Sequence, residues 1–297
     1  IGSLLLPLGT TSGTTNAVIF GVALMHHRDA ALNIISRSPR FDLTHHDMDA
    51  PPWWHYRKRK TLYADGFAPQ GSRMLMQFLL VRENGPEKFV EWESDFEHVE
   101  AWLESHQPPK WSGEIDDSLA GKGELIFMEH CGCCHGEYGE SDEYPESVVP
   151  IDEIGTDRVR FDALTNKERS ALNDSWFGHF GRDAVSIGSR QRPLGYVAPP
   201  LDGVWASAPY FHNGSVPTLW HVLHRESRPS VWRRTPAGYD TQKVGLEIEE
   251  RSVSWFAEAV SDGMPSAQRR QYFDTSKLGK SAKGHSYPDA LTHLEKT

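Results

Sequence analysis

The cysteines constrain this chain most, because all of them lie in one cluster, Cys131, Cys133 and Cys134, directly before His135. A disulfide framework spreads its cysteines so that each bridge closes a loop, and the sequence has no cysteine elsewhere with which these could pair. The cluster therefore argues against a disulfide-stapled fold. It indicates a site at which thiols and an imidazole act together.

Cys131, Cys134 and His135 form a C-x-x-C-H motif, which is the attachment signature of c-type haem. Two thiols that bracket two residues can each form a thioether with one vinyl group of the same porphyrin. The adjacent imidazole then lies beneath the iron as its proximal ligand. The motif thus predicts one covalent haem c (iron), with Cys133 as a spare thiol.

Two alternatives for the cluster stay open. A structural zinc site takes about four ligands, often as two separated pairs, so zinc would need scattered histidines in addition. A thioredoxin-like dithiol would need a βαβ context, which the sequence does not show. Only the haem interpretation predicts a visible chromophore.

Charge and hydropathy argue against two classes of partner. The chain has 31 Lys and Arg against 41 Asp and Glu, a net charge of -10, whereas nucleic acids and anionic membranes favour basic surfaces. No segment approaches the roughly 18 apolar residues of a membrane span. The chain begins at Ile1 rather than Met, and a helix-start signal at Pro288 lies close to Thr297, so we expect a piece of a longer protein.

Helical signals dominate the sequence. Apolar residues recur every three or four positions from Phe89 to Leu103, which predicts an amphipathic helix packed into a core. Thr165 and Glu168 have the spacing of a capping box and predict a helix through Leu172. Other segments that favour helix are residues 17–35, 74–81, 116–129 and 218–224. Since no segment alternates convincingly as a strand does, we expect a mostly α fold with long ordered loops.

Gln107-Pro108-Pro109-Lys110 is the best domain boundary in the sequence. We expect residues 1–112 to be a linking segment, or the remainder of an N-terminal haem domain, and residues 113–297 to be a cytochrome c-like haem-binding domain. Two charged runs flank the motif. The basic run 57–60 is either a solvated loop or an anion contact, and the acidic run 136–157 is either a solvated loop or a face for a basic partner.

The sixth ligand of the predicted iron is open on chemical grounds, because a c-type haem takes Met, His or nothing in that position. Met128 lies in the helix that leads into the motif and is poorly placed to reach the opposite haem face. The remaining candidates downstream are Met264, His179, His212, His221, His224, His285 and His293.

Three further segments carry a resemblance to a known family: DAPPWW at residues 49–54, ASAPYFHNGSVPTL at 206–219 and KGHSYPDAL at 283–291. Together with the C-x-x-C-H motif, they resemble the C-terminal haem domain of the bacterial di-haem cytochrome c peroxidase superfamily. The resemblance is closest to the rubber oxygenase-like di-haem cytochromes. It covers residues 115–297 well and the first hundred residues loosely.

The resemblance implies a ligand set. In the rubber oxygenase-like branch the C-terminal haem is bis-histidine, with its second histidine near the end of the chain, which corresponds to His285 here. The peroxidases themselves use a Met soon after the segment that contains His212, and this sequence has none there. By the same resemblance His212 lies close to the haem, as a structural or propionate-contacting residue. Trp53 and Trp54 would lie either between two haems or in a domain interface.

The resemblance also implies a second C-x-x-C-H motif on an N-terminal domain, where peroxide or dioxygen reacts, but this sequence has no second motif. Some members hold a calcium ion at a domain interface, although no residues here are assigned as its ligands. We therefore expect a periplasmic or secreted electron-relay domain of a peroxidase- or oxygenase-type oxidoreductase, whose partner is a redox protein or a second haem domain. The alternative is a stand-alone electron-carrier cytochrome c.

Overall fold

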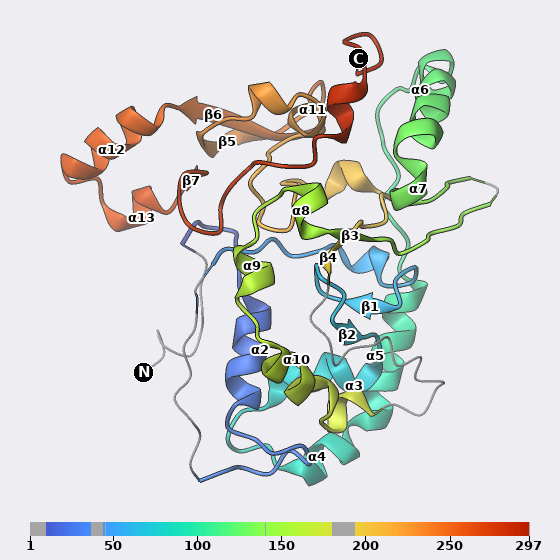
Figure 1. Cartoon of the computed structure of the whole chain (residues 1–297), viewed down its shortest axis with the longest axis vertical. Helices are drawn as coiled ribbons and strands as arrows, with labels where there is room; N and C mark the ends of the chain where they lie inside the picture. Colours follow the sequence, from blue (N-terminus) through green and yellow to red (C-terminus); the bar gives the residue numbers. More distant parts are fainter. Residues whose placement is uncertain (1–9, 37–43, 45, 140, 180–193, 297) are drawn as a thin grey trace.

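The computed structural model describes residues 10–36, 44, 46–139, 141–179 and 194–296 (Figure 1). Its α-helices are α2 (Ala17–Met25), α3 (Ser72–Leu75), α4 (Pro86–Glu91), α5 (Glu93–Ser105), α6 (Asp117–His130), α7 (Gly132–His135), α8 (Ile151–Ile154), α9 (Val159–Asp162), α10 (Asn166–Asn173), α11 (Leu219–Leu223), α12 (Val253–Ser261) and α13 (Ser266–Arg269). Short 3₁₀ helices are Trp53–His55, Met76–Leu79, Trp176–Gly178, Val204–Ala206, Arg225–Ser227 and Tyr287–Ala290. The strands are β1 (Thr61–Leu62), β2 (Ala68–Pro69), β3 (Val148–Pro150), β4 (Gly195–Val197), β5 (Val231–Asp240), β6 (Gly245–Arg251) and β7 (Tyr272–Asp274).

The strands overturn the expectation of a mostly α fold. They form three small antiparallel sheets, β1-β2, β3-β4 and β6-β5-β7. The longest strand, β5, contains Pro236 and Gly238 and has an irregular register between Arg234 and Tyr239, so it lacks the alternation by which strands are recognised. Charge pairing across the strands, such as Arg233 with Glu249, replaces part of the apolar pattern.

The predicted helices agree with the structure where the sequence contains a local signal. A capping box is present at the start of α10, where the Thr165 side chain accepts a hydrogen bond from the Glu168 backbone. The predicted amphipathic helix is split into α4 and α5. Phe89 is fully buried and Leu103 is buried, as a core stripe requires, although Val99 on the same stripe is exposed. The first predicted helix is shorter than expected and ends at Met25.

The largest core cluster lies in the lower part of the view in Figure 1, around α2, α3 and α10. It combines residues from early in the chain, such as Ile19 and Phe89, with Leu172 and Phe177, which follow the C-x-x-C-H motif. Residues from both sides of the proposed boundary near residue 112 therefore share one core. The division of the chain at that point stays a prediction.

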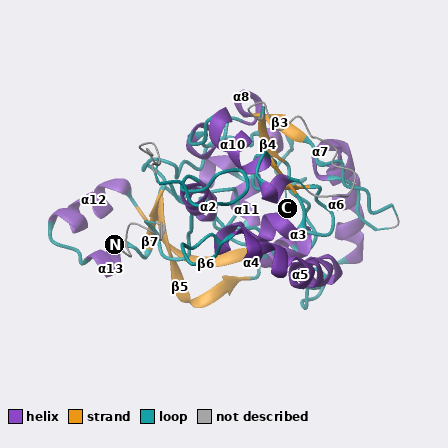
Figure 2. Cartoon of the chain, turned by 90° about the horizontal axis from the view of Figure 1, so that it is seen from below, coloured by secondary structure: helices purple, strands orange, loops and turns teal. Residues whose placement is uncertain are grey.

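The β6-β5-β7 sheet forms the upper left part of the view in Figure 1, and Figure 2 shows α12 and α13 beside it, on the opposite side of the molecule from α6. Successive residues of β5 pack into different hydrophobic clusters, because side chains alternate between the two faces of a strand. Val231 packs with Phe256 of α12, whereas Trp232 packs with Phe273 of β7. Ala208 packs against the cluster of Trp232 and Phe273, so the sheet also contacts the segment that precedes it.

Candidate functional site

The C-x-x-C-H motif lies on a single helical turn. Helix α6 runs from Asp117 to His130 and is capped by the Asp116 side chain. At Cys131 the backbone leaves helical geometry before α7. The Cys131 carbonyl accepts hydrogen bonds from the backbone N–H groups of Cys134 and His135, at 3.1 and 3.0 Å. Residues three and four positions apart share a helix face, so Cys131, Cys134 and His135 are brought to one side.

The three thiols differ in exposure. Cys133 is exposed, and its Sγ lies 3.8 Å from Sγ of Cys134. Burial raises the pKa of the Cys131 thiol, and burial together with the neighbouring Cys133 raises the pKa of Cys134 to about 11. Without a nearby cation to stabilise a thiolate, neither side chain has the low thiol pKa of a redox dithiol.

His135 is held in the tautomer that a metal ligand needs. Its Nδ1 donates a hydrogen bond to the Pro199 carbonyl at 2.8 Å. Since a carbonyl can only accept, the proton is on Nδ1 and the lone pair is on Nε2. Burial also lowers the pKa of His135, so the ring is neutral.

His285 faces His135. The two ring centroids are 6.2 Å apart, with their planes inclined by 64°. Two imidazoles that bind one metal ion from opposite sides, each through a nitrogen about 2.0 Å away, have ring centres about 6 Å apart. The pair therefore has the spacing of two axial ligands of one iron, which satisfies a first test of whether these residues fit a haem.

The backbone around His285 is tightly held. Gly284 has φ +79° and approaches the end of α8 so closely that a Cβ there would lie 2.3 Å from the Thr156 nitrogen. The His285 N–H donates to the Ile154 carbonyl at 2.7 Å. His285 itself has φ +50°, in the left-handed region that non-glycine residues rarely adopt. Packing against α8 thus fixes a strained residue opposite the motif.

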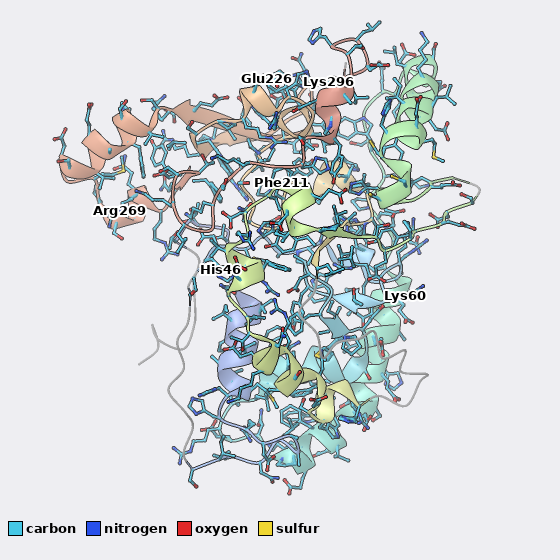
Figure 3. All side chains as sticks on the ribbon, viewed as in Figure 1. His46, Lys60, Phe211, Glu226, Arg269 and Lys296 are labelled. Atoms are coloured by element: carbon cyan, nitrogen blue, oxygen red, sulfur yellow. The ribbon has the colours of Figure 1, made fainter. Side chains whose placement is uncertain are left out.

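Two aromatic rings flank the His285 imidazole. Phe211 lies 5.9 Å and Tyr287 5.4 Å from it, centroid to centroid. Nδ1 of His285 is buried without a hydrogen-bond partner in the part of the chain that the structure describes. Beside this loop is a cleft of about 800 Å³, whose lining includes Glu226 and Lys296; Figure 3 shows both at the upper rim of the molecule, above Phe211.

His212 does not join the facing imidazoles. Its ring packs on Tyr196 of β4, with centroids 4.4 Å apart. Burial, helped by the charge of Arg160, lowers the pKa of His212 to about 3, so its ring is neutral. Phe211 therefore contacts His285, whereas the next residue, His212, packs on β4.

The other candidate ligands lie elsewhere. Met264 packs against the cluster of Val231, Phe256 and Tyr272. His179 donates to the Ser175 carbonyl, and His221 contacts Thr218. His224 stacks on Trp220, and the His293 ring lies 6.1 Å from the His224 ring. Within the described part of the chain, His285 is the candidate whose ring contacts His135.

The two charged runs pair with each other beside the motif. Lys58 bonds both Asp142 and Asp202, and its ammonium group lies 4.7 Å from the Tyr138 ring centroid. Arg59 pairs with Glu146 at 3.7 Å. Two carboxylates of the acidic run, Asp142 and Glu146, therefore pair with the basic run.

Trp53 and Trp54 line a smaller cleft of about 230 Å³ together with Asp49. Trp53 is exposed, whereas Trp54 donates its indole N–H to the Asp202 carbonyl at 2.7 Å. Burial raises the pKa of the Asp49 carboxyl to about 8. Asp202 thus links Trp54 to Lys58, because its carbonyl accepts from the indole and its carboxylate from the ammonium group.

Two absences among the described residues bear on the predictions about membrane spans and metal sites. None of the helices there is both long enough and apolar enough to cross a membrane. No group of three or more His, Cys, Asp or Glu side chains among those residues has the arrangement of a metal site. The zinc alternative for Cys131–His135 therefore gains no support, and no calcium ligands can be assigned there.

Comparisons with known proteins support the haem interpretation of the motif. Residues 195–233 match a family described as RoxA-like, cytochrome c-like. The uncharacterized protein y4iM of Sinorhizobium fredii is 29% identical over 208 residues, which cover 63% of this chain and 45% of that protein. The uncharacterized protein y4iJ of the same organism is 25% identical over 236 residues, covering 62% of this chain and 37% of that protein. The chain thus spans less than half the length of these relatives.

The matched segment is the one that contacts the motif. It contains Pro199, which orients His135, and Leu201, whose N–H donates to the Tyr138 hydroxyl at 2.6 Å. It also contains Phe211, beside His285. Residues 195–233 are thus similar to a RoxA-like, cytochrome c-like family, and this similarity supports a cytochrome c-type domain with haem c and an electron-transfer role.

Proposed function

We propose that this chain holds one covalent haem c between His135 and His285 and relays electrons through it. In this proposal Cys131 and Cys134 form the two thioethers. The observation that carries it is the 6.2 Å separation of the two ring centroids directly at a C-x-x-C-H motif. The bound haem would supply a one-electron iron couple.

The protein residues have defined tasks in this arrangement. Pro199 holds the proton on Nδ1 of His135 and leaves Nε2 as the donor atom. Phe211 and Tyr287 pack beside the His285 ring. If His135 and His285 both hold the iron, no position would be left for peroxide or dioxygen, and the domain would transfer electrons without binding a substrate at the iron.

We further propose that the domain is the relay half of a di-haem oxidoreductase of the peroxidase or oxygenase type. The resemblance of residues 206–219 and 283–291 to that superfamily supports this, and so does the greater length of the relatives, which leaves room for another domain. Covalent haem attachment takes place outside the bacterial inner membrane, so a periplasmic or secreted protein follows. A full reading frame with a second C-x-x-C-H motif is expected; its absence would favour a stand-alone electron carrier.

The haem itself is tested by expressing the chain with a haem c maturation system. A pyridine haemochrome assay should report one covalent haem per chain, and the ferric spectrum should be that of a six-coordinate, low-spin iron. Metal analysis of the same sample serves as the control for zinc. Protein without covalent haem, or with stoichiometric zinc, would refute the proposal.

A further inference from the structure

Arg228 joins two segments of the proposed haem site. Its Nη1 donates to the carbonyls of Ala282 and Gly284, at 2.7 and 2.8 Å. Its Nε and Nη2 donate to the carbonyls of His221 and Val222 in α11, at 2.9 and 3.1 Å. One guanidinium thus ties the residues directly before His285 to a helix that is distant in sequence.

The same guanidinium also packs on a ring that contacts His285. It lies 4.8 Å from the centroid of Phe211, and Phe211 lies 5.9 Å from the His285 ring. Burial lowers the pKa of Arg228 to about 10, so the group is still a cation at neutral pH. A partly buried cation that bonds four carbonyls and an aromatic face is fixed in orientation, because each contact constrains the same rigid plane.

His285 needs such a constraint. Its φ of +50° is costly for a residue with a Cβ and persists only when neighbouring contacts over-determine it. The Ile154 carbonyl fixes the His285 N–H, but the carbonyls on its N-terminal side are held by Arg228. Lysine could not replace these contacts, because an ammonium group has no planar fork that reaches carbonyls on two segments.

We propose that Arg228 is a positioning residue that holds the His285 imidazole at the iron, through the Ala282 and Gly284 carbonyls and through Phe211. The inference rests on the proposed bis-histidine haem. It assigns to Arg228 no contact with the haem and no chemical step.

The test compares Arg228→Gln and Arg228→Lys in the full chain, matured with haem c. We expect the low-spin ferric spectrum to shift partly to high spin in both, and CO affinity of the ferrous protein to rise about tenfold in Arg228→Gln. Added imidazole should restore the low-spin spectrum, which a globally unfolded protein would not allow. Hydrogen exchange at residues 282–286 should become faster in both variants, with or without haem.

Arg225→Gln is the matched control. Arg225 lines the same cleft and carries the same charge, but it pairs with Asp289 and makes no bond to residues 282–284. Its variant should keep the wild-type spectrum, CO affinity and exchange rates. Wild-type spectra in both Arg228 variants would overturn the inference while leaving the haem proposal intact, whereas a wild-type chain without covalent haem would remove the haem proposal itself. If the Arg228→Gln protein does not accumulate, the spectrum and the exchange rates of Arg228→Lys test the inference.

Discussion

His135 and His285 lie opposite each other with ring centroids 6.2 Å apart, although one belongs to α7 and the other to a loop near the C-terminal end. Three separate segments maintain this relationship. Pro199 fixes the first ring, the end of α8 fixes the backbone of the second, and Arg228 ties down the residues before it. The site is therefore assembled by long-range contacts rather than by the motif alone.

The first prediction concerns His285→Ala. It should keep covalent haem, because the thioethers do not involve His285, but lose the bis-histidine low-spin spectrum and gain CO binding in the ferrous state. His293→Ala is the control, since His293 lies against His224 instead of His135. An unaltered spectrum in His285→Ala would mean that the sixth ligand is another residue.

The second prediction separates the three thiols. Cys133→Ala should leave the pyridine haemochrome spectrum and the haem content unchanged, because Cys133 is exposed and out of register with the motif. Cys131→Ala and Cys134→Ala should each leave one vinyl group unbonded, which shifts the haemochrome band and lowers haem retention under denaturing electrophoresis. Equal loss in all three variants would contradict the assigned register.

How much of this site the sequence predicts depends on whether a local signal exists. The C-x-x-C-H spacing and the Thr165–Glu168 capping box are local, and each predicts its element directly. His285 is found by resemblance only, since the spacing of histidines does not choose among the candidates. Arg228 and Pro199 leave no trace in the sequence, because their role is to hold carbonyl groups or to offer one, and any residue has a carbonyl.

The strands and the charged runs are also hard to predict from the sequence, because their partners are distant along the chain. Strand β5 is held by partners on β6 and β7, and its Pro236 and Gly238 hide it from pattern-based recognition. The basic run contains Lys58, whose partner Asp142 is far along the chain. From the sequence alone the basic run is a solvated loop or an anion contact, and only the fold reveals that part of it pairs with Asp142 and Glu146.

The third prediction concerns a buried ion cluster under the site. Asp65 accepts hydrogen bonds from Arg160 and Arg169, both at 3.0 Å, and all three side chains are at most 1% exposed. Asp65→Asn would leave two guanidinium groups without their counter-charge, so we expect the free energy of unfolding to fall by about 3–5 kcal/mol. Urea denaturation measures this. Asp152→Asn, which breaks an exposed pair with Arg158, should change stability little.

The last prediction is a pH dependence that originates at Asp49. Burial raises the pKa of its carboxyl from 3.8 to about 8, against the attraction of Arg234, so the folded protein keeps a proton that the unfolded chain releases. The stability that this proton contributes is complete below about pH 4 and is lost as the pH rises through about 8. Relative to Asp49→Asn, the wild-type protein should therefore lose stability between pH 5 and pH 9, as followed by thermal unfolding. Asp29 serves as the control, because hydrogen bonds from Asn33 lower its pKa below this window, and the difference between wild type and Asp29→Asn should stay constant over the same range. A constant difference for Asp49→Asn as well would show that Asp49 is ionised in the folded protein.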